Sequence, residues 1–213
     1  MEFDESKAIK TLESCGYIRH FIPKMLDRPS LFVAKMLYGM NITPNAVTIF
    51  SIACWLTGLL SLMLGRPYPF LMLMWLSQFC DCVDGKLARA TGNVTKLGHW
   101  LDNYIDLNFK IPITLCAVGF YVGLPYGILA LICINLYWMR DSFVKSWKVI
   151  NNRERIIGLG KPAIWNLYSS GEYITWVLPV VLLFNPILSF VLFGLAELIL
   201  LIGVVIITNG MAK

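Results

Sequence analysis

Four aspartates stand in two pairs within otherwise apolar segments of the sequence. Asp81 and Asp84 are three residues apart and Asp102 and Asp106 are four apart, so each pair shares one face of a helix. A chain reversal around residues 92–93 would fold the two helices against each other, which allows the four carboxylates to converge. An unpaired charge inside an apolar membrane helix costs several kcal/mol, so the four carboxylates need a shared explanation.

Divalent cations supply that explanation. Converging anions repel one another, and burial disfavours their charged forms unless cations lie between them. Oxygen-only ligands favour Mg²⁺, Mn²⁺ or Ca²⁺ over zinc, and carboxylates on two rigid helices predict a two-metal site that clamps a phosphoryl or pyrophosphate group. The alternative is ordinary ion pairing within the membrane, for which only Arg89, Lys86 and Lys110 are available against four acids.

Small residues accompany the aspartates. Gly85 and Ala88 lie beside the first pair and Gly98 precedes the second, which lets backbones and a flat ligand approach closely. Arg89 adds a fixed cation near the same face, and its guanidinium suits a phosphate. The pattern therefore predicts a site for a phosphorylated ligand with a planar part.

The composition indicates where these helices lie. The 213 residues are 57% hydrophobic and 15% charged, whereas a soluble domain has about 45–50% apolar and roughly 25% charged residues. With a mean hydropathy of +0.66, the excess predicts contact with lipid in a single membrane domain. This excludes a secreted module and a disordered tail. The net charge of +5 is better explained by membrane flanks than by a nucleic-acid partner.

The apolar pattern predicts an all-α integral membrane protein with six transmembrane helices and an N-terminal amphipathic juxtamembrane helix. Residues 1–40 have apolar positions at helical spacing with basic residues between them, typical of a helix on the membrane surface. The transmembrane domain is expected over 41–213. Six runs near the roughly 20 residues that a bilayer requires are predicted at 44–64, 69–90, 98–121, 124–147, 162–184 and 187–207.

Positive residues predict the orientation. The N-terminal segment carries six lysines and arginines and residues 140–161 carry six more, whereas Arg66 stands alone on the opposite side. Because basic residues favour the cytoplasmic side, six spans place both termini and the aspartate site in the cytoplasm.

The aspartates and their neighbours form one motif, which reads Asp81-x-x-Asp84-Gly85-x-x-Ala88-Arg89, then eight residues, then Gly98-x-x-x-Asp102-x-x-x-Asp106. All eight fixed positions match the signature of the CDP-alcohol phosphotransferase family, and the chain resembles that family over nearly its whole length. The resemblance implies six transmembrane helices with an amphipathic N-terminal helix and, usually, a homodimer. It further implies a CDP-linked lipid donor such as CDP-diacylglycerol, a small polar alcohol acceptor and the release of CMP in phospholipid biosynthesis.

The resemblance also implies roles for the motif residues. Asp81, Asp84 and Asp102 would ligate two divalent ions, Mg²⁺ or Mn²⁺, and Asp106 would complete the site and act as the general base. The cytidine would bind beside Asp84, where three small residues make room for it: Gly85, Ala88 and Gly98.

Two further features concern the donor's phosphates. Arg89 would anchor the diphosphate or serve a structural role. The segment Thr43-Pro44-Asn45-x-x-Thr48 resembles the start of the family's first span, where polar side chains such as Asn45 and Thr48 reach the phosphates. A cap and a proline in the first turn also predict a helix start there.

Basic residues are candidates for the acceptor site. Lys110 lies one helical turn after Asp106 and is expected either to face the same cavity or to pair with Glu197 or Glu172. Lys145 and Lys148 resemble in rough position the basic residues that hold a phosphorylated acceptor in related enzymes. Alternatively they are ordinary cytoplasmic flanks.

Glu172 is a second unusual acid. Aromatic residues surround it in the sequence, so it could cradle an ammonium group such as that of choline, ethanolamine or serine. Alternatively the aromatics form an interfacial belt and the glutamate pairs with Arg140 or Lys145.

Two other functions are compatible with some of these features. An aminoalcohol phosphotransferase would move phosphocholine or phosphoethanolamine from a soluble CDP-aminoalcohol to diacylglycerol, but the short chain disfavours it. A divalent-cation transporter would need acids distributed across the bilayer, whereas these four cluster at one end.

Overall fold

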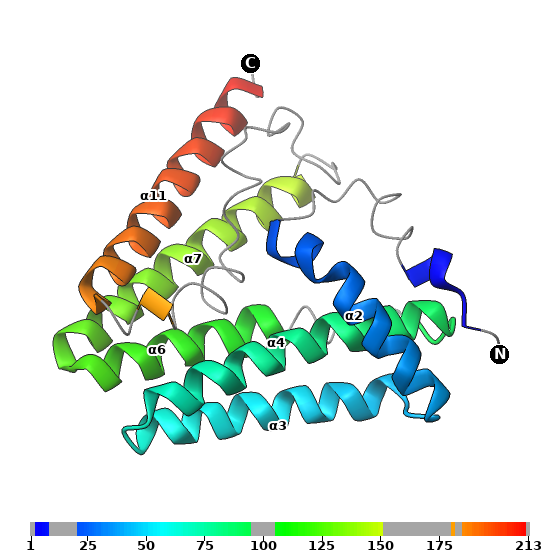
Figure 1. Cartoon of the computed structure of the whole chain (residues 1–213). Helices are drawn as coiled ribbons and strands as arrows, with labels where there is room; N and C mark the ends of the chain where they lie inside the picture. The colour runs from blue at the N-terminus through cyan, green and yellow to red at the C-terminus, as the bar shows by residue number, and fades with distance from the viewer. Residues whose placement is uncertain (1–2, 9–20, 95–104, 151–179, 182–184, 212–213) are drawn as a thin grey trace. The chain divides into compact units, whose positions relative to one another are not determined.

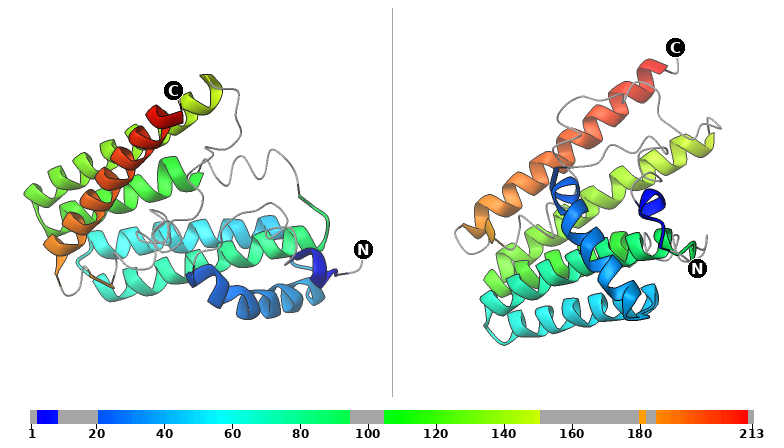
Figure 2. Two further views of the ribbon diagram at one scale, coloured as in Figure 1. Left: turned by 90° about the horizontal axis from the view of Figure 1, so that it is seen from above. Right: turned by 45° about the vertical axis from the view of Figure 1, so that its right-hand side comes forward.

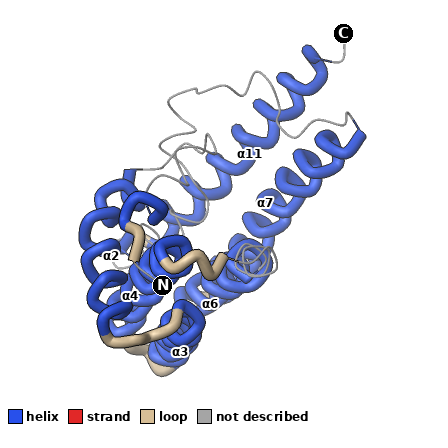
Figure 3. Tube along the Cα trace, turned by 90° about the vertical axis from the view of Figure 1, so that its right-hand side faces the viewer, coloured by secondary structure: helices blue, strands red, loops and turns tan. Residues whose placement is uncertain are grey.

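The secondary structure in the described part of the chain is helical. The computed structural model describes residues 3–8, 21–94, 105–150, 180–181 and 185–211, and within these ranges it contains helices, turns and loops but no strand (Figure 3). The chain divides into two compact units, Met1–Ile111 and Pro112–Lys213, which are described separately.

The first unit is built on a helical hairpin. Helix α3 covers Pro44–Met63 and helix α4 covers Pro67–Ala90, and they lie side by side in the views of Figures 1 and 2. Gly65 makes the reversal between them with a φ of 74°, a conformation that costs a glycine little. The bounds of α3 and α4 therefore agree within a few residues with those of the first two predicted runs, 44–64 and 69–90.

The two helices of the hairpin approach closely at small residues. The Oγ of Ser51 donates to the carbonyl of Ser77 at 2.9 Å, and both serines are buried. A Cβ added to Gly58 would lie 3.3 Å from the Cβ of Leu73, so the glycine sets the separation of the helices there. The start of α3 is also as predicted, since the Oγ1 of Thr43 accepts from the amide of Ala46 at 3.3 Å.

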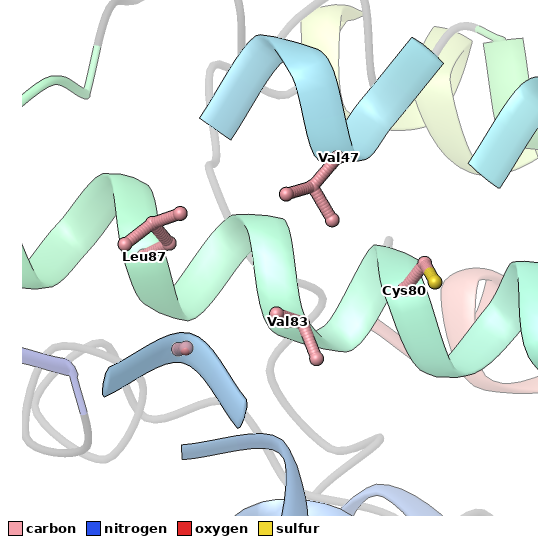
Figure 4. Packing of buried hydrophobic residues seen from close by; sticks show 5 residues of the cluster. Val47, Cys80, Val83 and Leu87 are labelled. Carbon is pink, nitrogen blue, oxygen red and sulfur yellow. The ribbon is translucent and has the colours of Figure 1, made fainter. Parts of the chain in front are cut away.

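Helix α2, Phe21–Gly39, packs on α4. A buried cluster joins α2 to the hairpin, with Ala34 from α2, Val47 from α3, and Cys80, Val83 and Leu87 from α4 (Figure 4). The opposite side of α2 leaves large apolar side chains exposed, including Met25, Phe32 and Met36. Such an amphipathic helix matches the character that the sequence predicts for the N-terminal segment.

The first unit ends in a π-helical turn, η1, over Asp106–Lys110. The sequence predicts one continuous span over 98–121, but the structure interrupts it with this turn before helix α6, Ile111–Val122. Each turn of a π-helix holds more residues than an α-helical turn, so the positions on either side of η1 do not follow α-helical spacing. The start of this predicted span lies outside the described residues.

The second unit contains α6, helix α7 over Leu124–Ile150, and helix α11 over Pro186–Met211. Gly123 turns the chain between α6 and α7, and a Cβ on Gly119 would come within 2.8 Å of the Cβ of Ala130. Helices α7 and α11 pack together, with Cys133 of α7 beside Gly194 of α11. Fully buried Phe190 and Phe193 fill this unit's core.

Membrane character is clearest in α3. Pro44–Met63 is the one helix in the described ranges that is long and apolar enough to cross a bilayer by its length and composition. Three shorter apolar stretches accompany it: Asn108–Val122, Leu124–Arg140 and Phe190–Gly203. Almost all of the predicted fifth span, 162–184, lies outside the described residues, so the count of six spans stays a prediction.

Candidate metal and nucleotide site

Helix α4 carries the first half of the aspartate motif. Asp81 and Asp84 lie near its C-terminal end and three residues apart, so they share one face of the helix. Asp84 is buried, at 6% exposure, and the side chain of Asp81 is 16% exposed. Carboxylates buried to this degree require partners that donate hydrogen bonds or carry positive charge.

Asp84 accepts a hydrogen bond from a hydroxyl on the neighbouring helix. The Oγ1 of Thr48 on α3 lies 2.6 Å from the Oδ2 of Asp84, and the carbonyl of Pro44 lies 3.2 Å from the same hydroxyl. A hydroxyl has one proton, and the carboxylate is both the closer and the stronger acceptor. Thr48 therefore orients a carboxylate of the motif, a relationship that the sequence analysis did not foresee.

Asp81 forms an ion pair with a lysine of η1. The Nζ of Lys110 lies 3.3 Å from the Oδ1 of Asp81, and the side chain of Lys110 is only 9% exposed. The sequence left three possibilities open for Lys110: an acceptor role, a pairing with Glu197 or Glu172, and an ion pair with one of the motif's acids, which is the contact that the structure contains. In the structure Glu197 forms an ion pair with Arg140, at 2.7 Å.

The second half of the motif is only partly described. Asp106 begins η1, and its side chain lies outside the described part of the structure, as do Gly98 and Asp102 entirely. Among the side chains that are described, no group of three or more histidines, cysteines, aspartates or glutamates is placed to hold a metal. The convergence of all four aspartates therefore stays a prediction.

Arg89 lies folded along α4. A Cβ added to Gly85 would meet the Nη1 of Arg89 at 3.2 Å, so the guanidinium occupies the space above the glycine. The Nε of Arg89 donates to the carbonyl of Ala8 at 3.4 Å. Ala88 is partly buried on the same stretch of helix. Gly85 thus makes room for the arginine of the motif.

The carbonyl that Arg89 meets belongs to a helical turn near the N-terminus. The backbone N–H of Asp4 donates to the carbonyl of Ala90 at 3.2 Å, which attaches this turn to the C-terminal end of α4. The Asp4 carboxylate accepts from Ser6 and from the amide of Lys7, and these bonds lower its pKa from 3.8 to about 2. No pattern in the sequence predicts this contact, because spacing does not relate residues so far apart along the chain.

A buried ion pair attaches α2 to the motif helix. The Nζ of Lys86, whose side chain is 4% exposed, lies 3.1 Å from the Oδ1 of Asp27. Lys86 was a candidate partner for the motif's acids, whereas the structure pairs it with Asp27 on α2. Because unpaired buried charges are costly, this pair fixes how α2 lies on α4.

The structure describes only some of the remaining predicted site residues. Asn45 is exposed in the first turn of α3. Lys145 and Lys148 lie on α7 in the second unit, with side chains outside the described part of the structure. Glu172 lies outside the described residues.

The donor set fits a hard divalent cation. Asp81 and Asp84 present carboxylate oxygens from one helix face, and the hydroxyl of Thr48 orients one of them. Mg²⁺ and Mn²⁺ prefer such oxygen ligands. The burial of both carboxylates also limits competition from water.

The described residues are organised in helices, leave much apolar surface exposed, and bury an acidic pair beside a helical hairpin. Residues 41–209 match the family model described as CDP-alcohol phosphatidyltransferase, so the chain belongs to that family. It is therefore an enzyme of a membrane-embedded transferase family, one that generally uses divalent metal ions and acts in phospholipid biosynthesis. The resemblance found in the motif is confirmed.

Several relatives share this family. The chain is 28% identical over 170 residues to the archaetidylinositol phosphate synthase of Pyrococcus horikoshii, covering 80% of this chain and 82% of that protein. A shorter match, 35% identical over 88 residues, is to the CDP-diacylglycerol–serine O-phosphatidyltransferase of Helicobacter pylori and covers 39% and 35% of the two chains. The phosphatidylinositol phosphate synthase of Mycobacterium marinum is 33% identical over 75 residues, or 35% and 32% of the two chains.

Proposed function

We propose that the protein transfers a phosphatidyl-type group from a CDP-linked lipid to the hydroxyl of a small polar acceptor and releases CMP. The complete eight-position motif inside the family match carries this proposal. The burial of Asp81 and Asp84 on one face of α4 supports it, because carboxylates are buried together where they serve a site.

The transfer is a substitution at phosphorus. The acceptor's hydroxyl oxygen forms a bond to the lipid-side phosphorus of the diphosphate, the bond from that phosphorus to the CMP oxygen breaks, and CMP leaves. The side chain of Asp106 accepts the proton of the hydroxyl as general base. Divalent cations, when bound, neutralise the charge that develops on the departing phosphate. We assign their coordination to Asp81, Asp84, Asp102 and Asp106.

The nucleotide binds against the small residues of the motif. Ala88 and Gly98 leave room for the cytidine, Asp84 lies beside it, and Gly85 leaves room for the guanidinium of Arg89 next to it. Arg89 supplies a cation for the diphosphate, because its guanidinium already lies over Gly85. At the start of α3, Asn45 completes the phosphate contacts, whereas Thr48 acts through Asp84, the carboxylate to which its hydroxyl donates.

The acceptor is a phosphorylated polyol in this proposal. The Pyrococcus horikoshii relative, which matches along most of both chains, is named as an archaetidylinositol phosphate synthase, and the Mycobacterium marinum relative as a phosphatidylinositol phosphate synthase. Lys145 and Lys148 at the C-terminal end of α7 offer positive charge for such an acceptor. Glu172 would instead favour an ammonium, as in serine, which is the acceptor in the name of the Helicobacter pylori relative.

The protein is proposed to cross the membrane six times, with both termini and the active site on the cytoplasmic side, and to act as a homodimer. The basic residues of the N-terminal segment and of 140–161 support this orientation. Cysteine accessibility in sealed vesicles tests it, since single cysteines at the termini should be labelled only from the cytoplasmic side.

Product release tests the reaction. Purified protein with Mg²⁺ or Mn²⁺ is given CDP-diacylglycerol or CDP-archaeol, together with inositol phosphate, glycerol 3-phosphate, inositol, serine or choline, and CMP release is measured. We expect CMP release that depends on a phosphorylated polyol. Turnover of CDP-choline with diacylglycerol, and none of a CDP-lipid, would contradict the proposal in favour of an aminoalcohol phosphotransferase.

A further inference from the structure

A lysine ammonium lies on a carboxylate that the proposed function assigns to a divalent cation. The Nζ of Lys110 is 3.3 Å from the Oδ1 of Asp81, an ion pair that joins η1 to helix α4. Both side chains are largely buried, at 9% and 16% exposure, so solvent screens the pair weakly. The contact is therefore strong enough to influence what else Asp81 binds.

Burial explains why such a lysine is needed. A carboxylate buried without a cation loses its hydration and gains nothing in return, and removing one partner of a buried pair is strongly unfavourable. When no divalent ion is bound, Lys110 gives Asp81 a positive charge within the protein. When a divalent ion is bound, two cations lie close to one carboxylate and repel each other.

The local structure allows Lys110 to withdraw. Lysine carries its charge on a flexible stem of four carbons, so the ammonium can move while the backbone stays in place. Lys110 is the last residue of the π-helical turn Asp106–Lys110, and single π-helical turns are frequent at functional sites. The same turn begins at Asp106, so the proposed base and the lysine that contacts Asp81 lie on one short π-helical segment.

We propose that Lys110 is a stand-in cation for Asp81, which the divalent ion displaces, and that Lys110 thereby sets the protein's affinity for the metal. The inference rests on the proposed function, since it takes Asp81 as a metal ligand. It makes Lys110 a positioning residue rather than an acceptor-binding one. It also accounts for a buried lysine beside a site that is to receive further cations.

Manganese binding by the full-length protein tests the inference. Mn²⁺ affinity is measured in detergent by electron paramagnetic resonance for the wild type, Lys110→Met and Lys110→Arg. The methionine variant should bind Mn²⁺ more tightly, on the order of tenfold, because the competing charge is gone. The arginine variant should bind it more weakly, because a guanidinium holds a carboxylate through two hydrogen bonds.

Thermal unfolding gives a second readout. In EDTA, Lys110→Met should unfold at a lower temperature than the wild type, and saturating Mn²⁺ should raise its unfolding temperature more than it raises that of the wild type. Lys86→Met is the matched control, because Lys86 is also a buried lysine on a carboxylate, that of Asp27. It should lose stability in EDTA while its Mn²⁺ affinity stays within about twofold of the wild type.

Two results would overturn the inference. One is an Mn²⁺ affinity of Lys110→Met that is unchanged or weaker, and a selective rise in its KM for the acceptor would then assign Lys110 to acceptor binding. The other, decisive if the methionine variant does not fold, is an affinity of Lys110→Arg equal to or tighter than that of the wild type. If the wild type itself binds no Mn²⁺, the metal site of the proposed function fails, which is a separate outcome.

Discussion

The hydroxyl of Thr48 on α3 donates to the Oδ2 of Asp84 on α4 across 2.6 Å. Asp84 is buried at 6% exposure, so this bond forms where water competes little for the carboxylate. The first helix of the hairpin therefore orients an acidic side chain of the second helix. In this family, whose members generally use divalent metals, such a bond fixes the orientation of a carboxylate that we propose as a metal ligand.

Replacement of Thr48 tests that relationship. Thr48→Val keeps the shape but removes the donor, and we expect transferase activity to fall about 10–100-fold, the usual cost of losing a group that orients a metal ligand. The free energy of unfolding should fall by about 1.5–3 kcal/mol, since the lost hydrogen bond is to a charged group. CMP release and chemical denaturation measure the two effects.

Thr48→Ser is the control for this substitution, because it retains a hydroxyl at the same place. It should keep most of the activity. Full activity in Thr48→Val would show that Asp84 does not depend on this bond.

The sequence predicted the hairpin better than it predicted contacts between helices. Thr43 and Pro44 marked the start of α3 because capping is a local property of the chain. The contacts of Lys86 with Asp27 and of Lys110 with Asp81 depend on how separate helices pack, which spacing along one helix does not reveal. The aspartate motif was recognisable for the opposite reason, since its residues are close in sequence.

The π-helical turn is a second feature that spacing did not predict. Counting α-helical turns placed Lys110 one turn after Asp106 in a continuous helix, whereas both residues belong to η1. A π-helical turn has no strong local sequence signal, because it arises where packing accommodates an extra residue. The family resemblance could name Asp106 as the base, but its helical setting emerges only from the structure.

Asp106→Asn should abolish transfer while the protein stays folded and binds nucleotide. An amide of the same shape cannot accept the acceptor's proton, and loss of a general base costs about 10²–10⁴-fold in rate. Single-turnover CMP release measures the rate, and binding of a CDP-linked lipid analogue measures the nucleotide site. Near-normal turnover in the purified variant would remove Asp106 as the base.

Gly85→Ala should weaken donor binding without unfolding the protein. The new Cβ would lie 3.2 Å from the Nη1 of Arg89, so the guanidinium must shift, and a flexible side chain does so at little cost. We expect the KM for the CDP-lipid to rise several-fold with a smaller change in kcat. Gly203→Ala on α11 is the control, because its added Cβ would meet no described atom within 4 Å apart from its chain neighbours and the nearby backbone of its own helix. Equal kinetics in the two variants would contradict the assigned role of Gly85.

Acid should release the N-terminal turn. The folded pKa of Asp4 is about 2 against an ordinary 3.8, because Ser6 and the amide of Lys7 donate to its carboxylate. A lowered pKa means that ionised Asp4 stabilises the turn above about pH 4, and that this stabilisation is lost as the pH falls toward 2. Protection of the Ser6 and Lys7 amides against hydrogen exchange should fall in that range. In Asp4→Asn this pH dependence should disappear, and its persistence would assign it to another group.

The ion pair between Arg140 and Glu197 should stabilise the second unit. The Nε of Arg140 on α7 lies 2.7 Å from the Oε2 of Glu197 on α11, which is fully buried, and the guanidinium also lies 5.5 Å from the ring centre of Tyr137. Arg140→Met leaves a buried carboxylate without this arginine, which should lower the free energy of unfolding by about 3–5 kcal/mol. Adding Glu197→Gln removes that charge as well, so the double variant should be more stable than Arg140→Met alone. Thermal unfolding in a double-mutant cycle measures this coupling, and strictly additive losses would show that the two side chains act independently.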